Sequence, residues 1–244
     1  MRFKTAWRGI YMYIGVVWLQ RFSRTKMLIG EDGLSRLRAT KVVIIGLGGV
    51  GSYAAEALAR AGIGFLRLVD YDIIDITNIN RQLHALDSTL GKAKVQVLAE
   101  RYREINPQLC LEPIQQRYVP GSGKELLAGC SWVIEAVDVV AAKSDIVCSS
   151  LKANQGIISC MGTGNKLDAS LLRVDDISKT FNCPLARSFR RELGKEGIHS
   201  GVPVVWSPEM PTGKDKSLVP ASISFVPATA GLLMASYVVN KILS

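Results

Sequence analysis

Short apolar runs alternate with longer segments in which apolar residues recur every three or four positions. The short runs predict buried strands at 42–45, 65–69, 111–115, 132–136 and 157–160. The longer segments predict helices at 52–61, 92–105 and 122–129, and another that ends at Asn154. Strands that alternate with helices are typical of a parallel sheet covered on both faces. We therefore predict an α/β fold with a Rossmann-like, mixed and mainly parallel sheet.

The regular alternation ends near residue 160. Beyond it we expect strands at 171–174, 202–206 and 222–226, helices at 185–193 and 228–243, and a mobile loop at 207–219. Pro203 has no backbone N–H to donate, so 202–206 is expected to be an edge strand. We expect residues 20–244 to form one domain, in which residues from about 161 to 244 contribute the substrate surface.

The two ends of the first 40 residues have different patterns. Residues 1–19 place three basic residues before an apolar run, as a signal peptide does, but no small-residue cleavage site follows and the run is too short to span a membrane. We expect a non-core extension and no stable membrane insertion. Residues 20–40 predict two short helical pieces broken at Gly30 and Gly33.

The strand at 42–45 runs directly into a Gly-x-Gly-x-x-Gly motif whose glycines are Gly46, Gly48, Gly49 and Gly51. Glycines let the backbone turn tightly and approach a phosphate, and the helix that follows directs N–H groups and its dipole at an anion. Asp70 ends the next strand, where such folds place a carboxylate that binds a ribose hydroxyl. The pattern indicates a nucleotide site; the alternative is an ordinary glycine-containing turn.

Polar residues gather where other strands end. Asp72, Asn78 and Arg81 follow the strand at 65–69, and Asp138 follows the strand at 132–136. Ligands bind at this edge of open α/β sheets. Lys94 falls in the first turn of a predicted helix, where a cation opposes the helix dipole, which indicates an anionic partner. Asp138 has an alternative role as the cap of the following helix.

Charge and cysteine content add two constraints. The net charge is +9, and residues 1–41 hold nine Lys and Arg against Glu31 and Asp32, a local excess of +7. A basic face attracts nucleic acid, acidic proteins or anionic lipid without choosing among them. Five cysteines without a Cys-x-x-Cys pair argue against a disulfide framework and a structural zinc site. We expect a reducing compartment, the cytoplasm.

The glycine motif, Asp70, the run 78–82, Lys94 and Asp138 occur in an order that resembles the E1-like adenylating superfamily, which includes ubiquitin-activating enzymes and the activators of molybdopterin and thiamine sulfur carriers. The resemblance implies an E1-like adenylating fold that uses ATP and Mg²⁺. It implies catalytic roles for Arg81 and Lys94 at the phosphates and for Asp138 toward Mg²⁺, with Asn78 close to the phosphates. It also implies a homodimer in which Arg24 reaches the partner subunit's ATP. An NAD(P)-binding reductase or a non-catalytic nucleotide-binding module would leave Arg81, Lys94 and Asp138 unexplained.

Four further segments, 21–25, 78–86, 162–168 and 183–187, resemble the tRNA threonylcarbamoyladenosine dehydratase branch. That branch uses ATP to cyclise the threonylcarbamoyl group on the adenosine next to the anticodon. On this reading tRNA is the substrate, bound by basic residues beyond the nucleotide motifs: Arg187, Arg190 and Arg191, with Lys214 and Lys216. Residues 1–19 have no counterpart in the branch, and Thr77 stands where its members often have Ser.

Two alternatives stay open at this point. The chain could instead adenylate a Gly-Gly-tailed sulfur-carrier protein, although bacterial enzymes of that kind typically carry two Cys-x-x-Cys pairs that this sequence lacks. Cys183 could form a thioester with a carrier or merely pack; intramolecular ring closure needs no carrier thiol, which favours packing.

Overall fold

The computed structural model describes residues 20–212 and 220–244. They form one seven-stranded sheet in the order β3-β2-β1-β4-β5-β7-β6. Every neighbouring pair is parallel except β6 and β7, which are antiparallel. The strands are β1 (Lys41–Ile45), β2 (Phe65–Val69), β3 (Cys110–Ile114), β4 (Trp132–Glu135), β5 (Gly156–Cys160), β6 (Arg173–Asp176) and β7 (Pro203–Trp206). The predicted mixed, mainly parallel sheet is confirmed.

Helices cover both faces of the sheet, which explains why the central strand β1 is continuously apolar from Val42 to Ile45. Val42 and Ile44 of β1 pack in one hydrophobic cluster, and Val43 and Ile45 pack in another on the opposite face. The first cluster includes residues of α3 (Gly51–Ala61), α4 (Lys94–Ile105) and α8 (Phe225–Leu243). The second includes residues of α5 (Gly123–Leu126), α6 (Val140–Lys152) and α7 (Pro184–Lys195).

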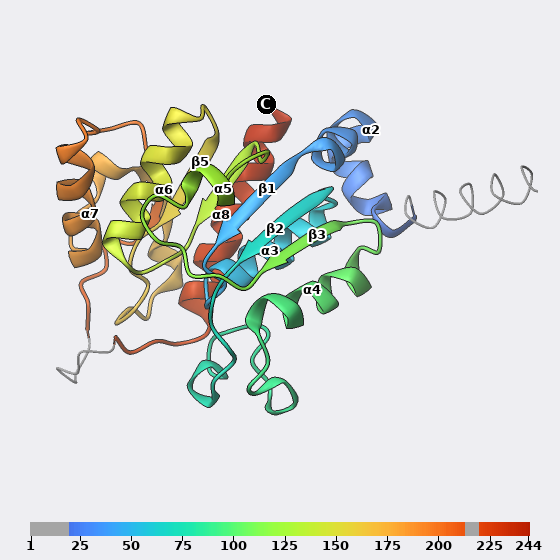
Figure 1. Ribbon diagram of the computed structural model, residues 1–244, viewed down its shortest axis with the longest axis horizontal. Coiled ribbons are helices and arrows are strands. Elements are labelled where there is room, and N and C mark those ends of the chain that lie inside the picture. The colour runs from blue at the N-terminus through green and yellow to red at the C-terminus, as the bar shows by residue number, and fades with distance from the viewer. Residues whose placement is uncertain (1–19, 213–219) are drawn as a thin grey trace, which may run out of the picture.

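Helix α2 (Ser23–Ala39) lies at the opposite end of the molecule from α7 (Figure 1). Gly30 interrupts it with a φ of 74°, a left-handed conformation that glycine adopts without steric cost. The expected break at Gly30 is therefore confirmed. The expected break at Gly33 is wrong, because the helix continues through Gly33, which is buried.

Two sequence-based expectations near the C-terminus are wrong: the strand at 222–226 and the edge position of the strand at 202–206. Residues 222–226 are not a strand, because α8 begins at Phe225; Pro227 falls in its first turn, where a missing N–H costs no intrahelical bond. The strand β7 is not at the edge, because β6 lies outside it. Pro203 pairs with Asp176 of β6, whereas pairing with β5 begins only at Val204. The missing N–H of the proline therefore removes no hydrogen bond from the pairing between β7 and β5.

Strands from the expected substrate portion, β6 and β7, belong to the same sheet as the glycine motif. Among the described residues, α8 alone is long and apolar enough to cross a membrane. It packs against α3, and a Cβ added at Gly231 would lie 2.3 Å from the Val50 carbonyl oxygen, so close packing accounts for its small and apolar residues. The expectations for residues 1–19 and for Lys214 and Lys216 lie outside the described residues.

Candidate functional site

A cavity of about 690 Å³ opens at the carboxyl ends of β1, β2 and β4. The segment between β2 and α4, which contributes one of its walls, extends below the sheet in the view of Figure 1. Nine of the residues singled out in the sequence line the cavity together: Gly46, Gly48, Gly49, Asp70, Asp72, Asn78, Arg81, Lys94 and Asp138. The structure thus brings together positions that are up to 92 residues apart in the chain, from Gly46 to Asp138.

The glycines of the loop meet different steric requirements. Gly46 has a φ of 89°, and a Cβ there would lie 2.7 Å from the Ala136 carbonyl oxygen. A Cβ at Gly51 would lie 1.8 Å from the Gly46 carbonyl oxygen, so this glycine is required for the loop to close on itself. At Gly48 the nearest atom would be Gln82 Nε2 at 3.9 Å. Gly48 therefore leaves open space in the cavity that a side chain would fill.

Asp70 holds the glycine loop against the segment that follows β2. Its Oδ2 accepts a hydrogen bond from the Leu47 N–H at 2.6 Å, and its Oδ1 accepts one from the Asp72 N–H at 2.8 Å. The carboxylate is nearly buried but still lines the cavity. It is positioned at the end of β2, where a ribose hydroxyl is expected.

Two cationic groups, Lys94 and Arg81, line the same cavity. Lys94 begins α4, and its Nζ donates to Asp72 Oδ2 at 2.7 Å. Arg81 donates to the Thr77 carbonyl oxygen at 2.7 Å and to Asn80 Oδ1 at 2.9 Å. Asn78 is buried and accepts a hydrogen bond from the Asp75 N–H. Both cations are therefore held in defined positions by the chain before any anion is present.

Four carboxylates line the cavity: Asp70, Asp72, Asp75 and Asp138. The first three accept hydrogen bonds from neighbouring groups, whereas Asp138 is exposed and has no hydrogen bond or ion pair within the described residues. Mg²⁺ prefers oxygen ligands and is commonly bound by one or two carboxylates together with phosphates. The uncommitted carboxylate of Asp138 fits this ion.

An aromatic wall that the sequence analysis missed faces the same cavity. Arg117, just after β3, donates to Tyr71 Oη at 3.1 Å, and its guanidinium lies 4.5 Å from the centroid of the Tyr71 ring. Both residues line the cavity. Flat aromatic and guanidinium groups stack on nucleobases. Tyr71 follows β2 and Arg117 follows β3, and this position shortly after parallel strands is the sequence signal that could have identified them.

A second missed group is the buried imidazole of His84, which is 2% exposed. Burial, and to a lesser extent the positive charge of Lys94, lower the pKa of His84 to about 4. The ring is therefore neutral near pH 7, and it adds no charge to the wall that Lys94 forms.

The remaining predicted residues do not line this cavity. Arg24 is exposed on α2 and does not line it. Arg187 and Arg191 are exposed on α7, but Arg190 is partly buried and donates to the Thr180 carbonyl oxygen at 2.8 Å and to the Thr180 hydroxyl. Gly51 contributes to the loop without lining the cavity. Cys183 is buried at the start of α7, where its Sγ accepts a hydrogen bond from the Ala186 N–H.

Several known proteins are similar to this chain over most of its length. The ThiF family model matches residues 22–244. A tRNA threonylcarbamoyladenosine dehydratase of Bacillus subtilis is 40% identical over 242 residues, which cover 92% of this chain and 95% of the relative. The Escherichia coli enzyme of the same name is 38% identical over 181 residues, covering 74% and 68%. A crystal structure of the E. coli dehydratase in complex with ATP matches with a TM-score of 0.89 at 34% identity, covering 93% of this chain and 95% of that one.

Proposed function

The chain belongs to the ThiF family, and on that premise we propose that it is an ATP-dependent enzyme that dehydrates N6-threonylcarbamoyladenosine in tRNA to its cyclic form. The observation that carries the proposal is the cavity, in which the glycine loop, Arg81, Lys94 and Asp138 converge. Its specific chemistry is supported by relatives that carry this activity in their names and align over more than nine-tenths of the chain.

ATP occupies the cavity in this proposal. The phosphates lie against the glycine loop, Arg81 and Lys94, the ribose lies at Asp70, and the base stacks on the wall formed by Tyr71 and Arg117. Asp138 holds Mg²⁺, which would offset phosphate charge when bound. The choice of ATP as the nucleotide is supported by solved structures of the E. coli relative in complex with AMP and with ATP.

The reaction needs charge compensation more than an acid or a base. The free carboxylate of the threonylcarbamoyl group attacks a phosphorus of ATP and gives a mixed anhydride, while the P–O bond to the leaving group breaks; attack at the α-phosphorus releases pyrophosphate and attack at the γ-phosphorus releases ADP. A nitrogen of the same group then attacks the activated carbonyl carbon and closes the ring, and the original carboxylate oxygen leaves on the phosphate. Two anions must meet in the first step, so Arg81 and Lys94 lower its barrier by offsetting their repulsion. Holding both reactants in one cavity lowers the barrier further, because the reacting groups are already close and oriented.

The tRNA contacts are proposed on helix α7. Arg187 and Arg191 are exposed there and available for phosphates, whereas Arg190 already binds Thr180. We further propose a homodimer in which Arg24, exposed on α2, completes the site of the partner subunit. Five cysteines without a Cys-x-x-Cys pair support function in a reducing compartment, the cytoplasm.

Mass spectrometry of nucleosides tests the proposal directly. The purified protein is incubated with ATP, Mg²⁺ and tRNA that carries threonylcarbamoyladenosine, and the tRNA is then digested. We expect the nucleoside to lose one water when ATP is present, and to remain unchanged without ATP or with the Lys94→Ala variant. Unmodified tRNA, together with ATP–pyrophosphate exchange that depends on a Gly-Gly carrier protein, would instead identify a sulfur-carrier adenylyltransferase.

A further inference from the structure

Beneath the cavity lies an ion pair that none of the chemistry above uses. Lys143 of α6 and Glu135 of β4 are both 0% exposed, and their charged atoms, Lys143 Nζ and Glu135 Oε2, are 2.5 Å apart. Ser159 of β5 donates its hydroxyl to the same carboxylate oxygen. Burying two charges is expensive, and a pair of apolar residues often gives the same or greater stability. Stability alone therefore does not explain why this pair is here.

The carboxylate of Glu135 uses its two oxygens in different directions. Oε2 accepts from Lys143 and Ser159, whereas Oε1 accepts a hydrogen bond from the Val137 N–H at 2.8 Å. Residues 136–139 form the turn between β4 and α6, and all four line the nucleotide cavity. Asp138 belongs to this turn, and the Ala136 carbonyl oxygen is the atom against which Gly46 packs. One side-chain bond thus holds the turn that forms this wall.

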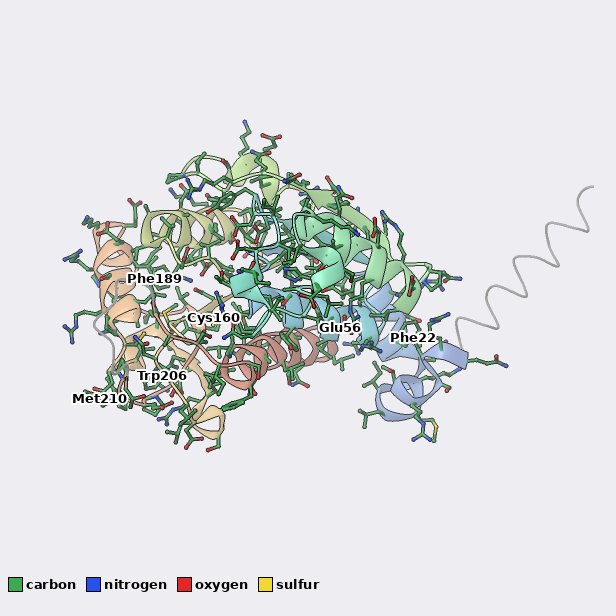
Figure 2. The ribbon with its side chains drawn as sticks, turned by 90° about the horizontal axis from the view of Figure 1, so that it is seen from below. Phe22, Glu56, Cys160, Phe189, Trp206 and Met210 are labelled. Carbon is green, nitrogen blue, oxygen red and sulfur yellow. The ribbon has the colours of Figure 1, made fainter. Side chains whose placement is uncertain are left out.

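The ammonium of Lys143 extends the link to the other half of the chain. It donates to the Cys160 carbonyl oxygen at 2.8 Å, at the end of β5, and lies 5.7 Å from the centroid of the Phe189 ring on α7. Figure 2 shows Cys160 and Phe189 in the same part of the molecule. Lys143 therefore neutralises the charge of Glu135 while its own position is fixed by the hydrogen bond to β5 and by the contact with α7.

We infer that Glu135 is a positioning residue for the activation step: neutralised by Lys143, it fixes the Val137–Asp138 turn in its nucleotide-facing conformation before ATP binds. The inference rests on the proposed function in that ATP occupies the cavity. A turn that is already fixed loses no conformational entropy when the nucleotide binds. Removing a group that supports a binding residue commonly changes affinity or activity by about tenfold to a hundredfold.

Two double variants separate positioning from burial of charge. Glu135→Gln/Lys143→Met removes both charges but keeps an oxygen that accepts from Val137, whereas Glu135→Leu/Lys143→Met removes the charges and the acceptor. ATP affinity by calorimetry and kcat with tRNA are measured for both. We expect the Gln form to stay within about threefold of wild type and the Leu form to lose about tenfold or more in ATP affinity and in kcat. Lys152→Met, which removes an exposed lysine from the end of the same helix, is the matched control and should change neither quantity.

Equal behaviour of the two double variants, at any level of activity, would overturn the inference. Because the Leu form could fail to fold, hydrogen exchange on the wild-type protein without nucleotide gives a second test. The Val137 amide, held by Glu135, should exchange at least about tenfold more slowly than the Asp138 amide, which donates no hydrogen bond to another described residue. Equal exchange of the two amides would also overturn the inference. A wild-type protein that binds no ATP would contradict the proposed function, and the exchange comparison would still decide whether Glu135 fixes the turn.

Discussion

Lys94 Nζ lies 2.7 Å from Asp72 Oδ2, although both residues line a cavity proposed to hold an anion. The lysine side chain is 5% exposed and the aspartate 41%. The aspartate therefore orients the lysine from its solvent side, and an ammonium has three donors, so two remain for other acceptors. The cation is in place at the start of α4 despite the unfavourable helix dipole there.

Lys94→Ala is expected to lower kcat/KM at least about a hundredfold with little loss of stability, because the charge acts on the transition state for activation. Steady-state kinetics and thermal melting test both parts. Lys92→Ala removes an exposed lysine two residues earlier and should leave kcat/KM unchanged. We expect the same loss for Arg81→Ala and for Asp138→Ala, and full activity in any of the three would remove that residue from the mechanism.

The glycine loop offers a matched pair of substitutions with opposite outcomes. Gly48→Ala places a Cβ in open cavity, so the free energy of unfolding should change by less than about 1 kcal/mol while ATP affinity falls at least about tenfold. Gly51→Ala drives a Cβ into the Gly46 carbonyl oxygen and should destabilise the fold by about 3 kcal/mol or more. Urea unfolding and calorimetry measure the two effects, and a Gly48 variant that binds ATP normally would show that the phosphates lie elsewhere.

The three arginines of α7 are expected to separate into two classes. Arg187→Glu/Arg191→Glu should raise the KM for tRNA and flatten its salt dependence, by about one unit of log–log slope for each phosphate that the variant no longer binds. Arg190→Ala should instead lower the free energy of unfolding by about 1–2 kcal/mol, because it removes the donor to the Thr180 carbonyl oxygen. The KM for ATP is the control in each case. An unchanged tRNA KM in the double reversal would move the tRNA surface off this helix.

Shared sites in a homodimer predict complementation between inactive subunits. Arg24→Ala removes the arginine supplied to the partner, and Lys94→Ala disables the protein's own site. After subunit exchange, half of the dimers are mixed and each mixed dimer has one intact site, so about a quarter of the wild-type rate should return. Sedimentation of labelled subunits verifies the exchange. Mixed dimers without activity would show that Arg24 acts within its own subunit, whereas full activity of the Arg24→Ala dimer alone would show that Arg24 has no role in the site.

His84 predicts a specific loss of stability in mild acid. Its pKa is about 4 in the folded chain and near 6.5 when unfolded, so protons bind preferentially to the unfolded state between these values. Stability from this group is complete above pH 6.5 and is lost as pH falls, by about 2 kcal/mol between pH 7.5 and pH 5. His84→Leu should flatten the dependence of the free energy of unfolding over this range, and an unchanged slope would show that other groups cause it.

The sequence was most informative where local pattern and burial agree. The strand at 42–45 and the glycines after it were predictable because two-sided burial gives a continuous apolar run and because each glycine meets a steric demand within its own loop. Residues 222–226 failed because Ile223 and Phe225 have the spacing of a strand, while the first turn of a helix accepts Pro227 equally well. The prediction of an edge strand at Pro203 was wrong because β6, which precedes β7 in the chain, lies outside it in the sheet. No local sequence pattern encodes this strand order.

Of the candidate site, the residues at strand ends were predictable because parallel strands bring their carboxyl ends to one edge. Glu135 and Lys143 were not, since each lies in an apolar segment and only the pairing of β4 with β5 and the packing of α6 bring them together. Arg190 looked like its neighbours in the helix until its hydrogen bonds to Thr180 were known. Hydrogen-bond and ion-pair partners that come from distant segments could therefore not be predicted from the sequence.

The position of α8 has a consequence for how this protein is made. Pro227 packs against Gly49, and Gly231 packs beneath Val50, so the helix that supports the nucleotide loop is translated about 180 residues after the loop itself. While the ribosome is still producing the middle of the chain, the glycine motif lacks this support and α3 exposes an apolar face. Full support of the loop requires that synthesis has passed α8, and termination before residue 225 leaves a chain with the complete motif but an unsupported site.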